Sequence, residues 1–584
     1  MYSRPIIVFC LAALLLNASF HSFAASSVAA GGKRKAGKAP ASIAASGRSA
    51  ATQIATSKPA GDQLQLPANW DGGFYIPPPS VPRDPRSGIY AVWYSDKPEV
   101  LNLPYVKGGQ VMELWADLDK GNGQYDFSAI DQKLEELANR GFSTTIQVNG
   151  GKKPKWLFEK VPYFPLRDGK GFVYQVQDKQ GTLMYWHPTF VQAYLDFIKA
   201  FAAHIKQSPH RDLILGVRMN FNAVGTEAMV CPEYARTQQG WIVPDGIDPG
   251  PFPWKPEYNT QYEEKVVEAW FREFDGVTKV FCRGTIDLQL KQKYKEQFDS
   301  GKAGWFWTGM MQKPQGFKGG GPFHSFFLDC RSGKTLGYGE PFGDAWGYHG
   351  GRGGGRGMAP SAANYWLMLL DLHEGLSFLA CYASDLQVAL NGKGPTAKEG
   401  DVSRLKDEFR KAFKFGAKYA GYHASPKESP GAWIALRQIE KTDDRHKIFD
   451  VMSNDATFLM KRLADKSVPV EKIGSPDSRF SAYARKLPKG EVMHLALDPL
   501  FAQSLASKKA GLNVVYFDGN NGSINVQTSG HTFSIDLKNS GNWQTASFEI
   551  PSASFDDDKD SIDITLTAGE DADIVLHMIE ITRE

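Results

Sequence analysis

The hydrophobic pattern of residues 213–227 changes from apolar to polar along the chain. The run begins Leu-Ile-Leu-Gly-Val, which is apolar, includes β-branched residues and has no helical period, so it predicts a buried strand. It then turns polar and carries Asn220, Asn222 and Glu227 near its end. An apolar strand with carboxylate and amide groups at its C-terminal tip is the arrangement that a (β/α)8 barrel uses to hold reacting groups.

Apolar strands and amphipathic helices alternate over the rest of the central region. Helical spacing predicts helices over residues 129–140, 188–204, 263–274, 288–298 and 361–373. The expected strands are Gly88–Tyr94, Gln110–Leu118, Ser143–Asn149, the run from Leu213, Thr278–Ile286, Ala303–Met311, Thr335–Glu340 and Leu376–Asp385. This alternation predicts an α/β fold, a (β/α)8 TIM barrel over residues 88–400.

The pattern changes after residue 401. A charged helix is expected over residues 406–419. Residues 432–437 and 513–584 alternate apolar and polar positions in short runs that Gly, Asn and Asp interrupt. Residues 401–584 are therefore expected to form a connecting helix and an all-β sandwich domain.

The N-terminal segment has a different composition. Residues 1–24 combine Arg4, an apolar run and a small-x-small site at Ser22-Phe23-Ala24, the features of a signal peptide. Residues 25–87 form a low-complexity and then Pro-rich lead-in that is expected to be disordered. We therefore expect a secreted protein, periplasmic or extracellular, without membrane insertion.

Charge and cysteine usage narrow the range of partners. Residues 1–62 hold seven basic residues and one acidic residue, which leaves 60 basic against 63 acidic residues in the rest of the chain. This balance gives no support to a nucleic-acid partner. The four cysteines after Cys10 are widely spaced, so a zinc site is not expected. Cys282 and Cys381, on expected strands, are predicted to be buried thiols.

Motifs in the second and third βα units carry a family resemblance. The runs W-x-D-L-D-K-G-x-G-x-Y-D-F, R-G-F-x-x-x-I-Q-V and P-x-W-L-F, between residues 115 and 158, resemble retaining TIM-barrel glycoside hydrolases. The β-galactosidases of family 42 and bacterial agarases and carrageenases are the most similar groups. The C-terminal runs resemble the β-sandwich modules attached to bacterial polysaccharide hydrolases. This resemblance implies a cofactor-free enzyme that acts on a polysaccharide or oligosaccharide.

Two glutamates fit the reaction that the resemblance implies. Retaining cleavage needs two carboxyl groups about 5–5.5 Å apart. Glu227 follows the expected fourth strand and Glu340 ends the seventh, 113 positions later. A barrel that spends about 30 residues per βα unit places these strand ends about 90 residues apart, or more with long loops. By analogy Glu227 is the acid/base and Glu340 the nucleophile, with Asp329, Asp344 and Asp385 as rivals for the second role.

One position departs from the family pattern. In the families that the chain resembles, Asn directly precedes the acid/base glutamate, whereas Thr226 stands there and the nearest Asn is Asn222. The acid/base assignment therefore depends on Asn222 reaching the sugar.

Polar and aromatic residues near the expected strand ends are candidate sugar contacts. The predicted substrate-binding residues are Asn149, Asn220, Asn222, Arg283, Trp307, Tyr338, Trp346, Arg352, Arg356 and Tyr382. Arg352 and Arg356 belong to a Gly-Gly-Arg-Gly-Gly-Gly-Arg-Gly run that is either a flexible lid or an anion clamp. With Lys152, Lys153 and Lys155, this run favours a sulfated galactan such as carrageenan.

Three alternatives remain open at this stage. A non-catalytic carbohydrate-binding protein could use the same barrel scaffold, and a hydrolase could act on a neutral or a different acidic polysaccharide. An inverting hydrolase or a lyase predicts a different carboxylate separation or unsaturated products.

Overall fold

The computed structural model describes residues 83–165, 180–227, 229, 231, 235–283, 288–308, 330, 333, 335–341, 343–346, 358–437, 455–556, 558 and 561–584. The expected signal peptide and most of the lead-in lie outside these residues, as do Asp329, Arg352 and Arg356. Among the described helices, none combines the length and the apolar character that a membrane crossing requires.

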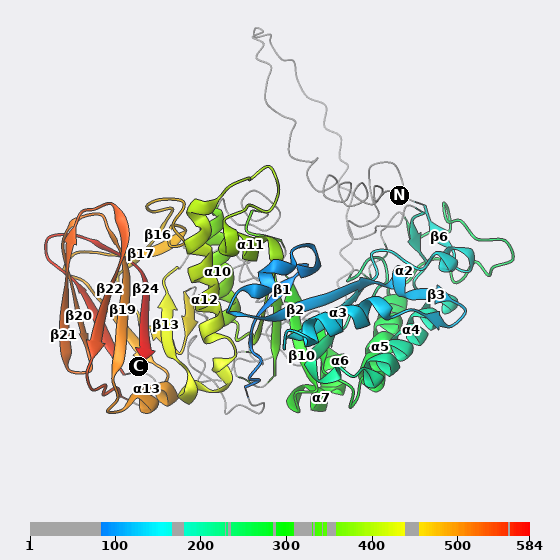
Figure 1. Ribbon diagram of the computed structural model, residues 1–584, viewed down its shortest axis with the longest axis horizontal. Coiled ribbons are helices and arrows are strands. Elements are labelled where there is room, and N and C mark those ends of the chain that lie inside the picture. The colour runs from blue at the N-terminus through cyan, green and yellow to red at the C-terminus, as the bar shows by residue number, and fades with distance from the viewer. Residues whose placement is uncertain are drawn as a thin grey trace, which may run out of the picture. The chain divides into compact units, whose positions relative to one another are not determined.

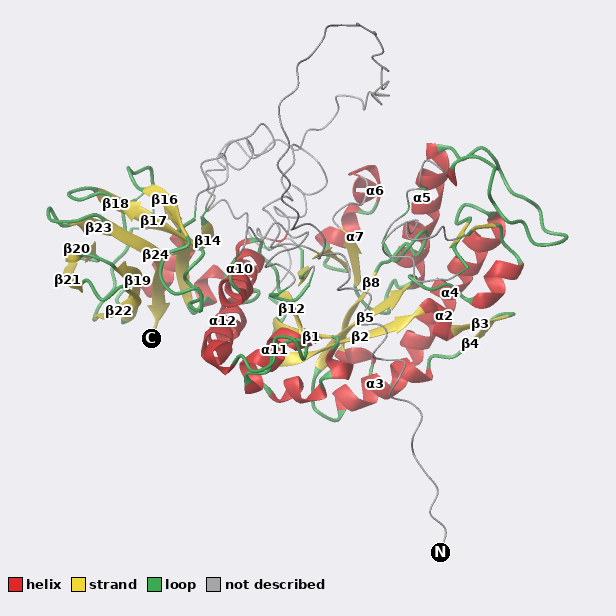
Figure 2. Cartoon of the chain, turned by 90° about the horizontal axis from the view of Figure 1, so that it is seen from above, coloured by secondary structure: helices red, strands yellow, loops and turns green. Residues whose placement is uncertain are grey.

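Eight parallel strands close into a barrel, in the order β1-β2-β5-β8-β9-β10-β11-β12 (Figures 1 and 2). Each lies within or overlaps an expected strand. Their bounds are β1 Gly88–Val92, β2 Val106–Leu114, β5 Ser143–Asn149, β8 Ile214–Arg218, β9 Val280–Arg283, β10 Ala303–Thr308, β11 Gly337–Glu340 and β12 Phe378–Tyr382. The TIM barrel predicted from the hydrophobic pattern is confirmed.

Large apolar side chains fill the interior of the barrel. Phe281 packs at 5.7 Å from Tyr338 and at 5.9 Å from Phe378, measured between ring centroids. The interior cluster contains Tyr90, Val92, Leu215, Phe281, Phe306, Leu336, Tyr338, Phe378 and Ala380. A packed interior of this kind confines polar chemistry to the ends of the strands.

Helices and short hairpins follow the strands along the chain, and Figure 2 shows helices around the strands of the barrel. The helices are α2 Trp115–Leu118, α3 Ser128–Ala138, α4 Pro188–Gln207, α5 Pro256–Glu273, α6 Leu288–Lys293, α7 Lys295–Asp299, α10 Pro360–His373, α11 Ala383–Asn391 and α12 Lys406–Tyr419. Two hairpins, β3 Asp119–Gly121 with β4 Gln124–Tyr125 and β6 Tyr163–Phe164 with β7 Thr182–Leu183, lie outside the barrel sheet. Helix α12 packs against α10, α11 and β1.

The strand ends differ from the sequence expectation in two places. Residues 115–118 were expected in the second strand but form α2, in which Trp115 and Leu118 are the two buried residues, at helical spacing. Residues 383–385 were expected in the eighth strand but begin α11. Both helices follow their strands without a Gly or Pro between them, so the pattern alone hides the change from strand to helix.

The C-terminal region consists mainly of two antiparallel sheets, so the expected β-sandwich is confirmed (Figure 1). One sheet has the order β14-β13-β24-β17-β16, with β19 paired to both β24 and β22; the other has the order β15-β18-β23-β20-β21. The strands are β13 Gly431–Ala435, β14 Ala456–Phe458, β15 Met460–Arg462, β16 Val468–Glu471, β17 Tyr483–Leu487, β18 Val492–Leu497, β19 Ala510–Asp518, β20 Asn521–Thr528, β21 His531–Lys538, β22 Asn542–Ile550, β23 Ile564–Ala568 and β24 Ile574–Arg583. Helix α13, Pro499–Leu505, follows β18.

Helices α10 and α12 both touch the C-terminal sheets. Tyr365 packs edge-on against Phe480 at 5.6 Å between ring centroids, and also contacts the ring of His577 at 5.7 Å. Trp366 meets His577 edge-on at 5.8 Å. The imidazole of His577 is completely buried, and its Nδ1 lies 2.7 Å from the carbonyl oxygen of Tyr483. Aromatic packing therefore joins α10 to the sandwich.

Candidate active site

A single buried arginine connects the two glutamates that the sequence singles out. Arg218 ends β8, and its Nη1 donates to Oε2 of Glu340 at 2.8 Å, while its Nη2 donates to Oε1 of Glu227. The side chains of Arg218, Glu227 and Glu340 are 4%, 10% and 11% exposed. Both carboxylates therefore lie within reach of one planar guanidinium at the C-terminal ends of the strands.

The two glutamates reach this arginine from different kinds of backbone. Glu340 is the last residue of β11, as expected. Glu227 lies nine residues beyond the end of β8, in the loop that follows, and not at the strand tip itself. Within that loop the Asn222 N–H donates to the Thr226 carbonyl at 3.0 Å, which turns the chain back just before Glu227.

A second arginine contacts Glu227. The Nη1 atom of Arg283, the last residue of β9, donates to Oε2 of Glu227, while Arg218 holds the other oxygen. The Arg283 side chain is 21% exposed, so this ion pair lies nearer to solvent than the Arg218 contacts. Two arginines on one carboxylate fix its orientation.

Inward-facing amides complete the polar layer beneath the carboxylates. Gln110 Nε2 donates to the Tyr338 hydroxyl oxygen at 2.6 Å and lies 3.4 Å from Oε2 of Glu340. Gln147 Oε1 accepts from Gln110 Nε2 at 3.1 Å and also from Arg218 Nη1. Burial raises the pKa of Tyr338 well above its ordinary value, so its hydroxyl stays neutral.

The guanidinium itself is held in a desolvated position. Its Cζ lies 3.9 Å from the centroid of the Phe306 ring, within cation–π range. Burial lowers the pKa of Arg218 and the Glu340 carboxylate opposes that shift. An arginine nevertheless remains protonated at any ordinary pH, so the cluster keeps a permanent positive charge between its carboxylates.

The two asparagines that are expected to contact sugar are buried against the backbone of β5. Asn220 and Asn222 are 1% and 0% exposed, and each Nδ2 donates to the Val148 carbonyl, at 2.9 and 3.3 Å. Asn222 has φ 49°, and a Cβ on Gly150 would lie only 2.5 Å from its Cβ, so only glycine fits opposite it. Both asparagines thus brace the strand ends, and their contact with sugar stays a prediction.

Of the other residues that are expected to contact sugar, some lie near the Arg218 cluster and others do not. The half-buried Asn149 accepts from Gln147 Nε2 at 2.6 Å, and Tyr382 lies close enough to Arg218 to influence its pKa. Trp346 is half-buried and packs against Phe409 of α12 at 5.7 Å between centroids. Trp307 belongs to β10, but its side chain, like Arg352 and Arg356, is outside the described part of the chain.

The rival carboxylates lie in different environments. Asp385, in the first turn of α11, is 2% exposed and accepts the Ala345 N–H at 3.1 and 3.0 Å. Burial and the nearby Asp344 raise the pKa of Asp385 well above its ordinary value. An acid held neutral in this way is a poor nucleophile. Across the described ranges, no three His, Cys, Asp or Glu side chains gather as a metal site would require.

The cysteines of the described strands are buried, as predicted. Cys282 in β9 is completely buried and Cys381 in β12 is 1% exposed, and burial raises the pKa of both thiols well above the ordinary value. Neither belongs to the polar layer around Arg218.

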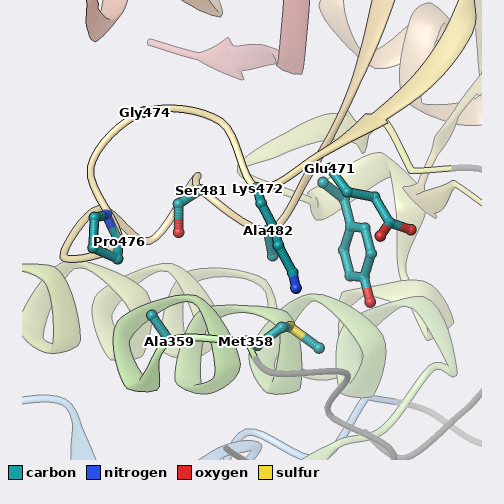
Figure 3. Close-up of a pocket in the computed structure, with 9 residues that line it drawn as sticks. Met358, Ala359, Glu471, Lys472, Gly474, Pro476, Ser481 and Ala482 are labelled. Atoms are coloured by element: carbon teal, nitrogen blue, oxygen red, sulfur yellow. The ribbon is translucent and has the colours of Figure 1, made fainter.

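A separate cavity of about 180 Å³ lies away from this cluster, between the start of α10 and the β16–β17 hairpin (Figure 3). Met358 and Ala359 lie on the helix side, and the Lys472 side chain extends from the hairpin towards them. Its lining shares no residue with the carboxylate cluster. The cavity is therefore a gap between α10 and the C-terminal sheets and not part of the candidate active site.

A scan for known families matches residues 108–243 to the glycosyl hydrolase family 42 model, described as β-galactosidase. The matched stretch contains Gln110, Gln147, Arg218 and Glu227. The chain is a glycoside hydrolase. The resemblance seen in the sequence motifs is confirmed.

Solved structures similar to the hydrolase include glycosidases and carbohydrate-binding modules. A glucosidase from Croceicoccus marinus is 10% identical with a TM-score of 0.28, over 83% of this chain and 91% of that one. A β-galactosidase from the psychrophilic Marinomonas ef1 is 11% identical with a TM-score of 0.34, over 57% and 59%. The C-terminal family 6 carbohydrate-binding module of the Zobellia galactanivorans laminarinase LamC is 13% identical with a TM-score of 0.15, over 21% and 91%. At these identities and TM-scores, no residue role is transferred to this chain.

Three residues of the polar layer were not predicted from the sequence. Gln147 lies between Ile146 and Val148 in β5, Gln110 precedes Val111 in β2, and Arg218 ends the apolar strand β8. Each of the three is less than 5% exposed. A charged or amide side chain beside buried apolar strand residues is rare unless it is paired, so these positions were the available signal.

Proposed function

We propose that Glu340 and Glu227 carry out a double displacement on a glycosidic bond, with Glu340 as nucleophile and Glu227 as acid/base. The observation that carries the proposal is the buried Arg218 bridge, since it brings to one guanidinium the two carboxylates that the sequence singles out. A shared cation between two carboxylates offsets their mutual repulsion and holds them at the mouth of a barrel.

The reaction follows from this arrangement in two steps. Glu340 attacks the anomeric carbon while the bond to the leaving oxygen breaks and Glu227 gives that oxygen a proton. Glu227 then takes a proton from water, the resulting hydroxyl attacks the anomeric carbon, and Glu340 is released as a carboxylate. Arg218 stabilises the Glu340 carboxylate before the attack and again after its release.

For the acid step, Glu227 must carry a proton although two arginines contact it. Arg283 is the more exposed of the two, so we propose that substrate displaces this contact and that Glu227 is protonated in the complex. The Arg218 contact keeps the Glu227 side chain directed at the glycosidic bond.

For the substrate we propose a sulfated galactan such as carrageenan. Basic residues after β5 support this choice: Lys155 is exposed, Lys152 is half-buried, and the buried Lys153 donates to the Gly150 carbonyl. With Arg283 near solvent, they supply cations that suit sulfate groups. Export by the N-terminal segment would bring the hydrolase to such a polymer, and we include secretion in the proposal.

Proton NMR of digests tests both parts of the proposal. Purified protein is incubated with κ-carrageenan, ι-carrageenan, agarose and a neutral β-galactan, and the anomeric signals are followed from the first minutes. The proposal predicts early appearance of the retained anomer from a sulfated polymer. An inverted first product would contradict the double displacement, and cleavage of only the neutral polymer would contradict the sulfated substrate. The culture medium of the source cells, probed for the protein, tests secretion.

A further inference from the structure

Trp93 differs from the other large side chains on the described surface. It follows the completely buried strand β1, is 47% exposed, and is the only aromatic residue among the six exposed large apolar side chains of the described ranges. It belongs to neither of the two hydrophobic core clusters. An indole in water at this position contributes nothing to the core, so its presence calls for another explanation.

The backbone at Trp93 is also unusual. Its φ of 59° and ψ of 31° place it in the left-handed region, where a bulky side chain is disfavoured. Other non-glycine residues with positive φ in the described chain include Asn122, Asn222 and Asn539, but Trp93 is the only aromatic one. Glycine would adopt this conformation without strain, yet the position holds the largest side chain.

The neighbouring residue explains how this conformation is held. Tyr94 is completely buried, and its ring occupies the space that a Cβ on Gly109 of β2 would need. The Lys97 N–H donates to the Tyr94 carbonyl at 2.8 Å and the Asp96 N–H to the Trp93 carbonyl at 3.3 Å. Burial of Tyr94 thus fixes the turn, and the indole of Trp93 is left on the outside.

The position of Trp93 relative to the carboxylates follows from the strand register. Val92 pairs with Tyr382 of β12, and β12 pairs on its other side with β11, which ends at Glu340. The C-terminal ends of β11 and β1 are therefore two strand spacings apart, or about 10 Å. A disaccharide spans such a distance, and Tyr382 lies between the two ends.

We propose that Trp93 is a stacking platform for a pyranose ring of the substrate and forms a binding subsite beside the cleavage centre. The inference rests on the proposed function and extends it, because a platform at this distance contacts a sugar other than the one that Glu340 attacks. The indole face covers the C–H face of a pyranose and removes both from water. The hydrolase therefore acts on chains and gains little from this subsite on a single-sugar glycoside.

Kinetics on substrates of two lengths test the platform. Trp93→Ala, Trp93→Phe and a control, Ile562→Ala, which truncates an exposed apolar residue of the sandwich, are compared with the wild type. The substrates are 4-nitrophenyl β-D-galactopyranoside and κ-carrageenan oligosaccharides of four and six sugars. We expect Trp93→Ala to lower kcat/KM on the oligosaccharides about tenfold or more, which corresponds to about 1.4 kcal/mol. Trp93→Phe should retain most of the rate, and the single-sugar glycoside and Ile562→Ala should show no change.

A binding measurement separates this inference from the proposed function. Affinity electrophoresis of Glu340→Gln, with and without Trp93→Gly, is run in gels containing κ-carrageenan, agarose or β-1,4-galactan. Retardation of Glu340→Gln that disappears with Trp93→Gly supports the platform, even if the wild type cleaves none of the substrates, a result that would overturn only the proposed function. Equal retardation of both variants, or no retardation in any gel, overturns the platform. Thermal melting checks the fold, since glycine suits the left-handed backbone and Trp93→Gly should melt no lower than the parent.

Discussion

Two pairs of carboxyl groups in the same barrel differ in the side chains that pair with them. Glu227 and Glu340 share the guanidinium of Arg218, at the ends of β8 and β11. Asp371 in α10 and Asp385 in α11 are more deeply buried, at 0% and 2% exposure, and among the described residues no arginine or lysine forms an ion pair with either. Burial alone therefore does not mark a catalytic carboxylate. A shared arginine distinguishes the Glu227 and Glu340 pair, whereas desolvation raises the pKa of Asp371 and Asp385 and holds these two acids neutral.

Removing either glutamate of the Arg218 cluster should have the largest effect on activity. Glu227→Gln is expected to lower kcat by about 100- to 10,000-fold, the range for loss of a general acid–base group. Glu340→Gln, which removes the nucleophile, is expected to lower it at least as much. Asp385→Asn is the matched control and should leave kcat near the wild-type value, since among the described residues its oxygens accept from the Ala345 N–H, away from the Arg218 cluster. Steady-state rates on the substrate identified by NMR check all three.

Removing the shared cation should damage both fold and activity. Arg218→Met removes the guanidinium that Glu340 and Glu227 share and leaves Arg283 to pair with Glu227. This loss is expected to cost about 3–5 kcal/mol of the free energy of unfolding. Adding Glu340→Gln to Arg218→Met should recover part of that loss. Urea denaturation of the single and double variants measures it. Purely additive losses would show that Arg218 and Glu340 do not interact as the structure indicates.

Replacing Asp371 is expected to raise the stability of the fold, the opposite of the Arg218 result. Both of its carboxyl oxygens are buried and accept no hydrogen bond from the part of the chain that the structure describes, and burial raises its pKa well above the ordinary value. The unfolded chain then loses the proton above about pH 4, while the folded chain keeps it, so stability falls as pH rises through this interval. Asp371→Asn should raise Tm by a few degrees at pH 7 and by much less at pH 4. Calorimetry measures Tm at both pH values. An equal gain in Tm at pH 4 and pH 7 would contradict this explanation.

His577 should produce the smallest effect, with the opposite pH dependence. Burial lowers its pKa to about 4, and its Nε2 has no partner in the aromatic cluster between α10 and the sandwich. The unfolded chain binds a proton near pH 6.5, whereas the folded chain resists it, so stability is lost as pH falls from about 6.5 towards 4. His577→Gln should flatten the Tm profile in that interval and leave it unchanged above pH 7. An unaltered profile below pH 6 would contradict this role.

Most of the architecture could be predicted because buried parallel strands appear as continuous apolar runs. The eight barrel strands and the position of Glu340 at the end of β11 follow from that pattern. The sandwich likewise follows from alternation between turn residues. The start of β2 at Val106 was missed, because the Lys-Gly-Gly that follows weakens the strand signal.

The details of the site could not be predicted because they depend on contacts between distant residues. No local pattern links Arg218 to Glu340, 122 positions away, or Gln110 to Tyr338, 228 positions away. The loop that returns Glu227 to the barrel mouth is set by the Asn222 turn and by two arginines on different strands. The exposed indole of Trp93 was indistinguishable from a core tryptophan, since only the structure shows Tyr94 in the interior and Trp93 outside.

Trapping the covalent intermediate is the most direct test of the central claim. The 2-deoxy-2-fluoro glycosyl fluoride of the sugar identified by NMR is incubated with the wild type, and the modified peptide is sequenced by mass spectrometry. The account predicts one added sugar on the peptide that contains Glu340, and none in Glu340→Gln. Attachment to Asp344, Asp385 or Glu227 would contradict the assignment of Glu340 as the nucleophile.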